Sequence, residues 1–232
     1  MAETGPATPR GAFIVIEGLD RAGKTTQVQR LNDLLSSRGI PVRNVRFPDR
    51  TTAIGKMIDS YLRGTTETSD HVIHLLFSAN RWELAKSIED SLCSGTTVLV
   101  DRYYYSGIVY SAAKGRKDLD LEWAREPEVG LPRPDLTLFL DIAPEIAEKR
   151  GGFGEERYEN KEMQKRVRAL FYVLTAQEGN EKEDMKVVDA GREKDAVAND
   201  IEGLVMEVIT KLQNNAAGNE LKRVEKWSTI TK

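Results

Sequence analysis

The chain has 232 residues, of which 40% are hydrophobic, 31% charged and 7% aromatic, the composition of an ordinary globular protein. Its 34 basic and 37 acidic side chains leave a formal charge of −3, so nucleic acid is not expected as a partner, and any anionic ligand must meet local positive charge. The single cysteine, Cys93, excludes an internal disulfide framework. No apolar run approaches the roughly 18 residues that span a bilayer, so a membrane is not expected either.

The chain is expected to form one domain between two polar ends. Residues 1–11 are small and polar, which predicts a disordered arm, and they lack the apolar run of a secretory signal. We therefore expect a location in the cytosol or the nucleus. Residues 12–213 carry the alternating apolar patterns of a folded domain, and residues 214–232 form a C-terminal extension that either frays or makes a last helix with a small docking face.

The first elements of the domain form a βαβ unit. Residues 12–17 are a short apolar run rich in Ile and Val, typical of a strand that is buried on both faces. Residues 25–37 carry apolar side chains at helical spacing, and a second strand is predicted at residues 42–47. A glycine-rich turn joins the first strand to the helix, which is the arrangement of a βαβ unit.

Three further apolar runs, each closed by an aspartate, predict three more strands. They lie at residues 97–100, 136–140 and 185–188, and the aspartates are Asp101, Asp141 and Asp189. Helices are predicted around them at residues 53–63, from a cap at Ser69 to about Cys93, and at residues 194–211. Alternating strands and helices predict an α/β fold, with a five-stranded parallel sheet flanked by helices on both faces.

Between the first strand and the first helix, the sequence Gly-Leu-Asp-Arg-Ala-Gly-Lys-Thr at residues 18–25 matches the phosphate-binding pattern G-x-x-x-x-G-K-[ST]. Its glycines let backbone N–H groups turn toward phosphate oxygens, and the helix adds the positive end of its dipole. We expect a nucleoside triphosphate here, with the Lys24 ammonium at its β- and γ-phosphates and the Thr25 hydroxyl on Mg²⁺. The expected contacts are Gly18, Arg21, Ala22, Gly23, Lys24, Thr25 and Thr26.

Two other strand ends add charged residues. Arg50 follows the second strand, and Asp101 and Arg102 end the third. Because ligands of open parallel sheets bind at the carboxyl ends of the strands, these side chains are expected to face the same volume as Lys24. Asp101 suits Mg²⁺ held through water, and a cap of the next helix is the less favoured alternative. Several cations around one point favour phosphoryl transfer between two anions.

Four blocks of the sequence resemble the thymidylate kinase family, whose members convert dTMP to dTDP with ATP in dTTP biosynthesis. They are EGLDRAGKTT at residues 17–26, FPDR at 47–50, DRY at 101–103 and GEERYE at 154–159. The resemblance implies a P-loop kinase fold for the domain, a short lid at about residues 150–157, Mg²⁺ as cofactor and a homodimer built through the long helix. Since the phosphate-binding loop contains Arg21, the chain is similar to the eukaryotic branch, in which this loop supplies the catalytic arginine.

The same resemblance implies a dTMP site with a role for each group. Asp20 would hold the deoxyribose 3′-hydroxyl, while Arg50 and Arg102 would bind the acceptor phosphate. Phe77 would stack on thymine, and Arg81, one helical turn further on, would bind its carbonyl edge. The remaining implied dTMP contacts are Phe47, Leu62, Ser106, Gly107, Tyr110 and Tyr158, the last of which would crowd the sugar 2′ position.

Beyond the P-loop, the resemblance places Arg150 against adenine with Arg192 nearby, and gives Arg21, Lys24, Asp101 and Arg102 the catalytic roles. Considered alone, the residues assigned to the base and sugar are more often packing or surface side chains, so the resemblance carries their assignment.

Two other functions stay open at this stage. One is a kinase for another pyrimidine nucleotide or for a nucleoside. The other is a nucleotide-dependent switch, although the N-K-x-D pattern of a GTPase does not occur in the sequence. Phosphoryl transfer to dTMP requires no catalytic histidine or serine triad, because the dTMP phosphate is itself an anionic nucleophile.

Overall fold

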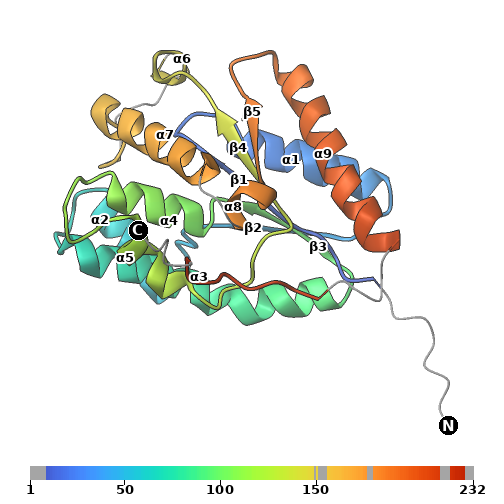
Figure 1. Cartoon of the computed structure of the whole chain (residues 1–232), viewed down its shortest axis with the longest axis horizontal. Coiled ribbons are helices and arrows are strands. Elements are labelled where there is room, and N and C mark those ends of the chain that lie inside the picture. Colours follow the sequence, from blue (N-terminus) through green and yellow to red (C-terminus); the bar gives the residue numbers. More distant parts are fainter. Residues whose placement is uncertain (1–8, 149, 151–155, 177–179, 215–219, 228–232) are drawn as a thin grey trace, which may run out of the picture.

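A computed structural model describes residues 9–148, 150, 156–176, 180–214 and 220–227. Five parallel strands form one sheet in the order β2-β3-β1-β4-β5 (Figure 1). The strands are β1 (Phe13–Gly18), β2 (Val42–Arg46), β3 (Thr97–Asp101), β4 (Leu136–Asp141) and β5 (Met185–Asp189). The predicted α/β class and the five parallel strands are confirmed, each within a residue or two of its expected place.

Helices cover both faces of the sheet. On one face α1 (Lys24–Ser37) packs beside α9 (Lys194–Asn214), and the other carries α3 (Asp70–Cys93), α4 (Tyr104–Ala112) and α7 (Lys161–Ala176) (Figure 1). The remaining helices are α2 (Ala53–Leu62), which packs on α3, α5 (Leu121–Arg125), the 3₁₀ turn η1 (Glu126–Glu128), α6 (Pro144–Glu148) and α8 (Asn180–Asp184). The predicted cap of the long helix is confirmed, since the Ser69 hydroxyl accepts from the Val72 N–H at 3.4 Å.

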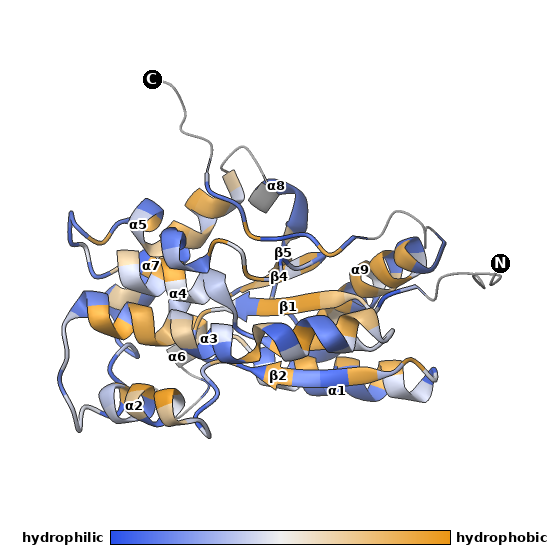
Figure 2. Ribbon diagram, turned by 90° about the horizontal axis from the view of Figure 1, so that it is seen from below, coloured by the Kyte–Doolittle hydropathy of each residue, from blue (hydrophilic) through white to orange (hydrophobic). Residues whose placement is uncertain are grey.

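The three central strands hold the core. Every residue of β1 and β3 is buried, whereas β2 and β5, which have a neighbour on one side only, expose several residues. Most of β1 carries the hydrophobic colour in Figure 2, as expected for a strand covered on both faces. Each fully buried Leu, Ile or Phe contributes about 1.5–3 kcal/mol to folding. None of the helices in the described ranges is both long and apolar enough to cross a bilayer.

Near both ends of the chain, the described residues are more ordered than the sequence predicts. Residues 1–8 of the expected arm lie outside the described residues, but Arg10 forms a two-pronged ion pair with Asp135, with both N–O distances at 2.7 Å. Residues 220–227 form neither a frayed end nor a helix. They run as an extended segment, red in Figure 1, that pairs antiparallel with Pro132 through Arg223 and buries Val224 to 1% exposure.

Candidate active site

The carboxyl ends of the strands surround one cavity of about 860 Å³. The parallel sheet brings the turns after β1, β2 and β3 to this edge, so Lys24, Arg50 and Arg102 face the same volume. Gly18 lies just outside the lining. The other predicted site residues all line the cavity: Asp20, Arg21, Ala22, Gly23, Lys24, Thr25, Thr26, Phe47, Arg50, Leu62, Phe77, Arg81, Asp101, Arg102, Ser106, Gly107, Tyr110, Arg150, Tyr158 and Arg192. The structure thus brings these residues together, while the role of each stays a prediction.

The loop between β1 and α1 forms the phosphate cradle. Gly23, at the start of α1, has a φ of +94°, a conformation that glycine adopts without steric cost. The buried Lys24 ammonium donates to the carbonyl oxygens of Gly18 at 3.3 Å and Leu19 at 2.6 Å. Burial lowers the pKa of Lys24 to about 8, and the positive charge of Arg102 adds to the decrease. A buried cation at a helix N-terminus is well placed to bind a phosphate.

Thr25 and Asp101 bring two oxygen ligands together at the same end of the cavity. The Thr25 hydroxyl donates to Asp101 Oδ2 at 2.6 Å, which links the start of α1 to the end of β3. Arg46, at the end of β2, approaches the same carboxylate oxygen at 3.9 Å. Hydroxyl and carboxylate oxygens are the ligands that Mg²⁺ prefers, so the chemistry of this pair fits the ion.

Arg21 and Arg102 are the two non-glycine residues of the described chain with positive φ, at 63° and 66°. Such a conformation costs about 1–3 kcal/mol per residue and tends to occur at functional sites. Arg102 donates to the Gly18 carbonyl at 2.9 Å and to the Ser106 hydroxyl at 3.0 Å, and it forms an ion pair with Asp20. Both arginines with positive φ line the cavity that Lys24 also lines.

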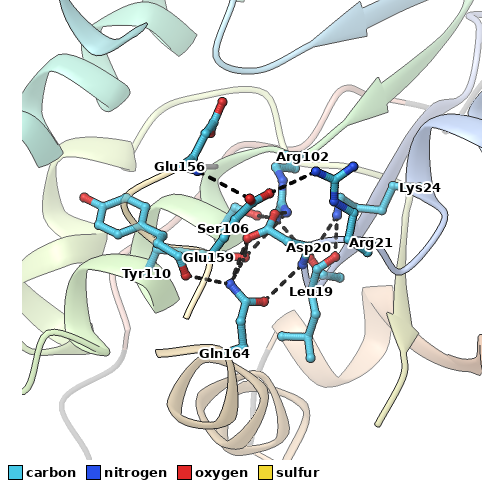
Figure 3. A network of polar contacts seen from close by, with 12 residues as sticks. Leu19, Asp20, Arg21, Lys24, Arg102, Ser106, Tyr110, Glu156, Glu159 and Gln164 are labelled. Carbon is cyan, nitrogen blue, oxygen red and sulfur yellow. Dashed lines mark hydrogen bonds and ion pairs between the residues drawn. The ribbon is translucent and has the colours of Figure 1, made fainter. Parts of the chain in front are cut away.

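Asp20 is the centre of a polar network (Figure 3). Its carboxylate accepts from Arg102, from the Tyr110 hydroxyl at 3.1 Å and from Gln164 Nε2 at 2.8 Å, while Gln164 Oε1 accepts from the Asp20 N–H at 3.1 Å. Burial alone would raise the pKa of the Asp20 carboxyl, but the charges of Arg102 and Lys24 outweigh it and keep the pKa below its ordinary value. Asp20 is therefore an ionised acceptor with a fixed orientation.

Arg50 and Arg21 contact carboxylates at the C-terminal end of the predicted lid and just after it, and Arg50 also contacts a carboxylate on α2. Arg50 pairs with Asp59 at 2.6 Å and with Glu156 at 2.7 Å, and Arg21 lies 3.6 Å from Glu159. Residues 151–155, most of the predicted lid, lie outside the described residues. At the base of the lid, Arg150 donates to the carbonyl oxygens of Arg21 at 3.1 Å and Ala190 at 2.9 Å, which ties it to the cradle.

Helix α3 forms the opposite end of the cavity. Phe77 and Tyr158 pack against a small apolar cluster of α2 and α3 that includes Leu62. One turn along, Arg81 is 2% exposed and forms a two-pronged pair with Glu128. A Cβ atom on Gly107 would lie only 2.5 Å from the Arg81 guanidinium, so glycine lets α4 pass close to this side chain in its observed position.

Sequence reasoning missed two residues of the site, Gln164 and Glu128. Neither stands in a motif that identifies it, and each lies far along the chain from its partner: 144 residues separate Gln164 from Asp20, and 47 separate Glu128 from Arg81. A third, Glu17, belongs to the first resembling block but received no role. It is buried, accepts from the backbone N–H groups of Tyr103 at 2.8 Å and Ser106 at 3.0 Å, and burial raises its pKa.

Comparison with known proteins points to one family. A family model described as thymidylate kinase matches residues 16–201. A thymidylate kinase of Schizosaccharomyces pombe is 50% identical over 199 residues, 86% of this chain and 93% of that protein. One of Arabidopsis thaliana is 54% identical over 166 residues, 72% of this chain but 62% of that protein, so the chain spans less than two thirds of this relative. A solved thymidylate kinase structure from Candida albicans, 37% identical, has a TM-score of 0.82 and covers 93% of this chain and 98% of that one.

Proposed function

The chain belongs to the thymidylate kinase family, and we propose that it phosphorylates dTMP by in-line transfer of the γ-phosphoryl group of ATP, giving dTDP and ADP. One observation carries the proposal. The P-loop lysine and two arginines from other strand ends line the same cavity as an aromatic side chain and a buried arginine on α3. A cavity with cations in its middle and a base-sized apolar wall at one end suits two nucleotides that meet at their phosphates.

ATP is assigned to the cradle. The backbone N–H groups of residues 18–26, the start of α1 and the Lys24 ammonium bind its phosphates, and Arg150 and Arg192 lie beside its adenine. Mg²⁺ is assigned to Thr25 and Asp101, whose oxygen atoms are in contact. When bound, Mg²⁺ neutralises phosphate charge.

dTMP is assigned to the remainder of the cavity. Arg50 and Arg102 bind its phosphate, and Asp20, held ionised by its neighbours, accepts from the 3′-hydroxyl. Phe77 stacks on thymine and Arg81 donates to a carbonyl oxygen of the base, while Tyr158 narrows the space beside the sugar. Other lining residues assigned to this site are Phe47, Leu62, Ser106, Gly107 and Tyr110. No general base is needed, because the acceptor phosphate is already ionised at neutral pH.

Arg21 is assigned the role of stabilising charge on the transferred group. Its positive φ, which the loop maintains at a cost, supports this assignment. Arg21→Ala should lower kcat by about 10³-fold, the low end of what a catalytic arginine supplies, with an unchanged circular dichroism spectrum. Arg30→Ala is the matched control, since Arg30 lies on α1 outside the cavity and forms an exposed ion pair with Asp195 on α9. A kcat near normal for Arg21→Ala would refute the role.

The reaction itself is tested by a coupled assay of ADP release with dTMP, dUMP, dCMP, dGMP and thymidine. The Candida albicans enzyme is described as having a broad substrate specificity, which makes the other monophosphates necessary controls. We expect the highest kcat/KM with dTMP. A preference for another pyrimidine nucleotide or for thymidine would support a sibling kinase, and ATP-dependent capture of a partner without phosphoryl transfer would support a switch.

A homodimer built through α3 is also proposed. Its side chains Val72, Leu75 and Trp82 are 46%, 47% and 43% exposed and follow helical spacing along one face, which fits an apolar surface that a second copy covers. Light scattering should then give a mass of twice 26.0 kDa. A cytosolic or nuclear location stays a prediction from the sequence, which imaging of the tagged chain tests.

A further inference from the structure

The pair formed by Arg81 and Glu128 is the most deeply buried ion pair that reaches the cavity. Glu128 is 0% exposed, and its carboxylate accepts from Arg81 Nε at 2.8 Å and from the adjacent Nη2. A guanidinium has five N–H donors in one plane, and the carboxylate engages two of them. Because both bonds lie in that plane, they set the direction in which the other donors point.

The backbone of Gly107 and the loop at Pro127 lie on either side of the Arg81–Glu128 pair. The Gly107 backbone lies so close to the guanidinium that a Cβ atom there would come within 2.5 Å of Nη2. On the α3 side, Ser78 and Trp82 both donate to the Pro127 carbonyl, at 3.1 Å and 2.8 Å. Pro127, which precedes Glu128, is thus hydrogen-bonded to α3 at two positions, three residues before Arg81 and one residue after Arg81.

The C-terminal segment, residues 220–227, is hydrogen-bonded to the residues that follow Glu128. Backbone bonds join Gly130 N–H to the Val224 carbonyl at 2.8 Å, Val224 N–H to the Leu131 carbonyl at 2.9 Å and Arg133 N–H to the Lys222 carbonyl at 2.9 Å. These bonds place Val224, which is 1% exposed, against the loop that follows Glu128.

Side chains of α5 and η1, which precede Glu128, add to the attachment of the C-terminal segment. Arg125 Nε donates to the Glu225 carbonyl at 2.8 Å, and its guanidinium lies 4.8 Å from the centre of the Trp227 ring. Lys226 pairs with Glu126 at 2.8 Å. The C-terminal segment therefore contacts the chain on both sides of Glu128, within three residues of it in each direction.

We propose that Glu128 is a positioning residue for nucleobase selection: it aims the Arg81 donors at a carbonyl oxygen of the base, and residues 220–227 keep it in place. This inference rests on the proposed function, in which Arg81 contacts thymine. Guanidinium donors match the carbonyl that thymine and uracil carry, and they do not match the amino group of cytosine at the same ring position. Removing the constraint should therefore weaken dTMP binding and reduce the preference for dTMP over dCMP.

The first test is Glu128→Gln, which keeps the shape of the side chain but offers only one acceptor oxygen and no charge. The KM for dTMP should rise about ten-fold, as for the loss of one charged hydrogen bond, while kcat and the KM for ATP change less than about two-fold. Glu128→Asp keeps the carboxylate, so its KM for dTMP should stay within about three-fold of the wild type. In an Arg81→Gln background, Glu128→Gln should have little further effect on the KM for dTMP.

The second test changes a partly buried residue of the C-terminal segment that does not line the cavity. Trp227→Ala removes the ring beneath Arg125 and should raise the KM for dTMP about three-fold, with the KM for ATP unchanged. Arg30→Ala, which removes a surface ion pair elsewhere, should change neither value. If Glu128→Gln does not fold, by circular dichroism and thermal unfolding, Trp227→Ala decides the question.

The outcomes separate this inference from the proposed function. If the wild type does not phosphorylate dTMP, the proposed function fails. If the wild type does so, and folded Glu128→Gln has a normal KM for dTMP or raises both KM values alike, only the positioning role is refuted. A normal KM for dTMP in Trp227→Ala refutes the contribution of the C-terminal segment, and where Glu128→Gln does not fold it refutes the positioning role as well.

Discussion

ATP binding should weaken above pH 8 because of one buried lysine. Lys24 is 7% exposed, and burial lowers the pKa of its ammonium from an ordinary value of 10.5 to about 8. If the protonated form alone binds ATP tightly, affinity follows the protonated fraction, which falls from about nine tenths at pH 7 to about one tenth at pH 9. We therefore expect the Kd of ATP to rise about ten-fold over this range.

The lowered pKa of Lys24 also makes the stability of the folded chain depend on pH. The folded chain releases the Lys24 proton near pH 8, and the unfolded chain releases it near 10.5, so the unfolded state holds more protons between these values. Stability from this residue therefore rises with pH across that window. The difference between the two pKa values corresponds to about 3 kcal/mol, which is the cost of burying the charge at neutral pH.

Calorimetric titration with ATP alone, at fixed Mg²⁺ and without dTMP, measures the first effect and avoids ionisation of thymine. Lys24→Arg is the control, because a guanidinium keeps its charge over the whole range. Its affinity, whatever the absolute value, should not change between pH 7 and 9. A wild-type Kd that stays constant to pH 10 would refute the reasoning, since the ammonium would then keep its proton despite burial.

Two further substitutions test the cavity. Asp101→Asn removes the carboxylate charge that contacts Thr25, and kcat should fall about 10²-fold while more Mg²⁺ is required for half-maximal rate, as a Mg²⁺ titration of the rate would measure. An unchanged Mg²⁺ requirement would contradict the assignment. Gln164→Leu removes two bonds to Asp20 at similar volume, so the KM for dTMP should rise about ten-fold in steady-state kinetics, and the KM for ATP should not. Equal increases in both KM values would indicate a general loss of folding instead.

Much of the cavity end that contains the P-loop could be predicted from the sequence, because the sequence patterns that identify it span only a few residues. The P-loop occupies eight consecutive residues, and the three central strands are short apolar runs because parallel strands are covered on both faces. The convergence of Arg50 and Arg102 with Lys24 followed from one topological fact, that parallel strands end at the same edge.

The cavity end at α3, which we assign to the nucleobase, could not be predicted from local patterns in the sequence, because its geometry depends on contacts between distant parts of the chain. Nothing in the pattern around Glu128 distinguishes it from a solvated glutamate, yet the fold buries it completely against Arg81. For the C-terminal segment the sequence predicts fraying or a docked helix, and it does not predict the extended attachment, which includes backbone bonds that any sequence can make. The amino-acid order thus determined which elements form and where the P-loop and the charged strand ends lie, because strand periodicity and the P-loop act over a few residues. Packing of the whole chain decided which side chains surround Arg81 at the proposed base site, because burial and ion pairing arise only between segments brought together by folding.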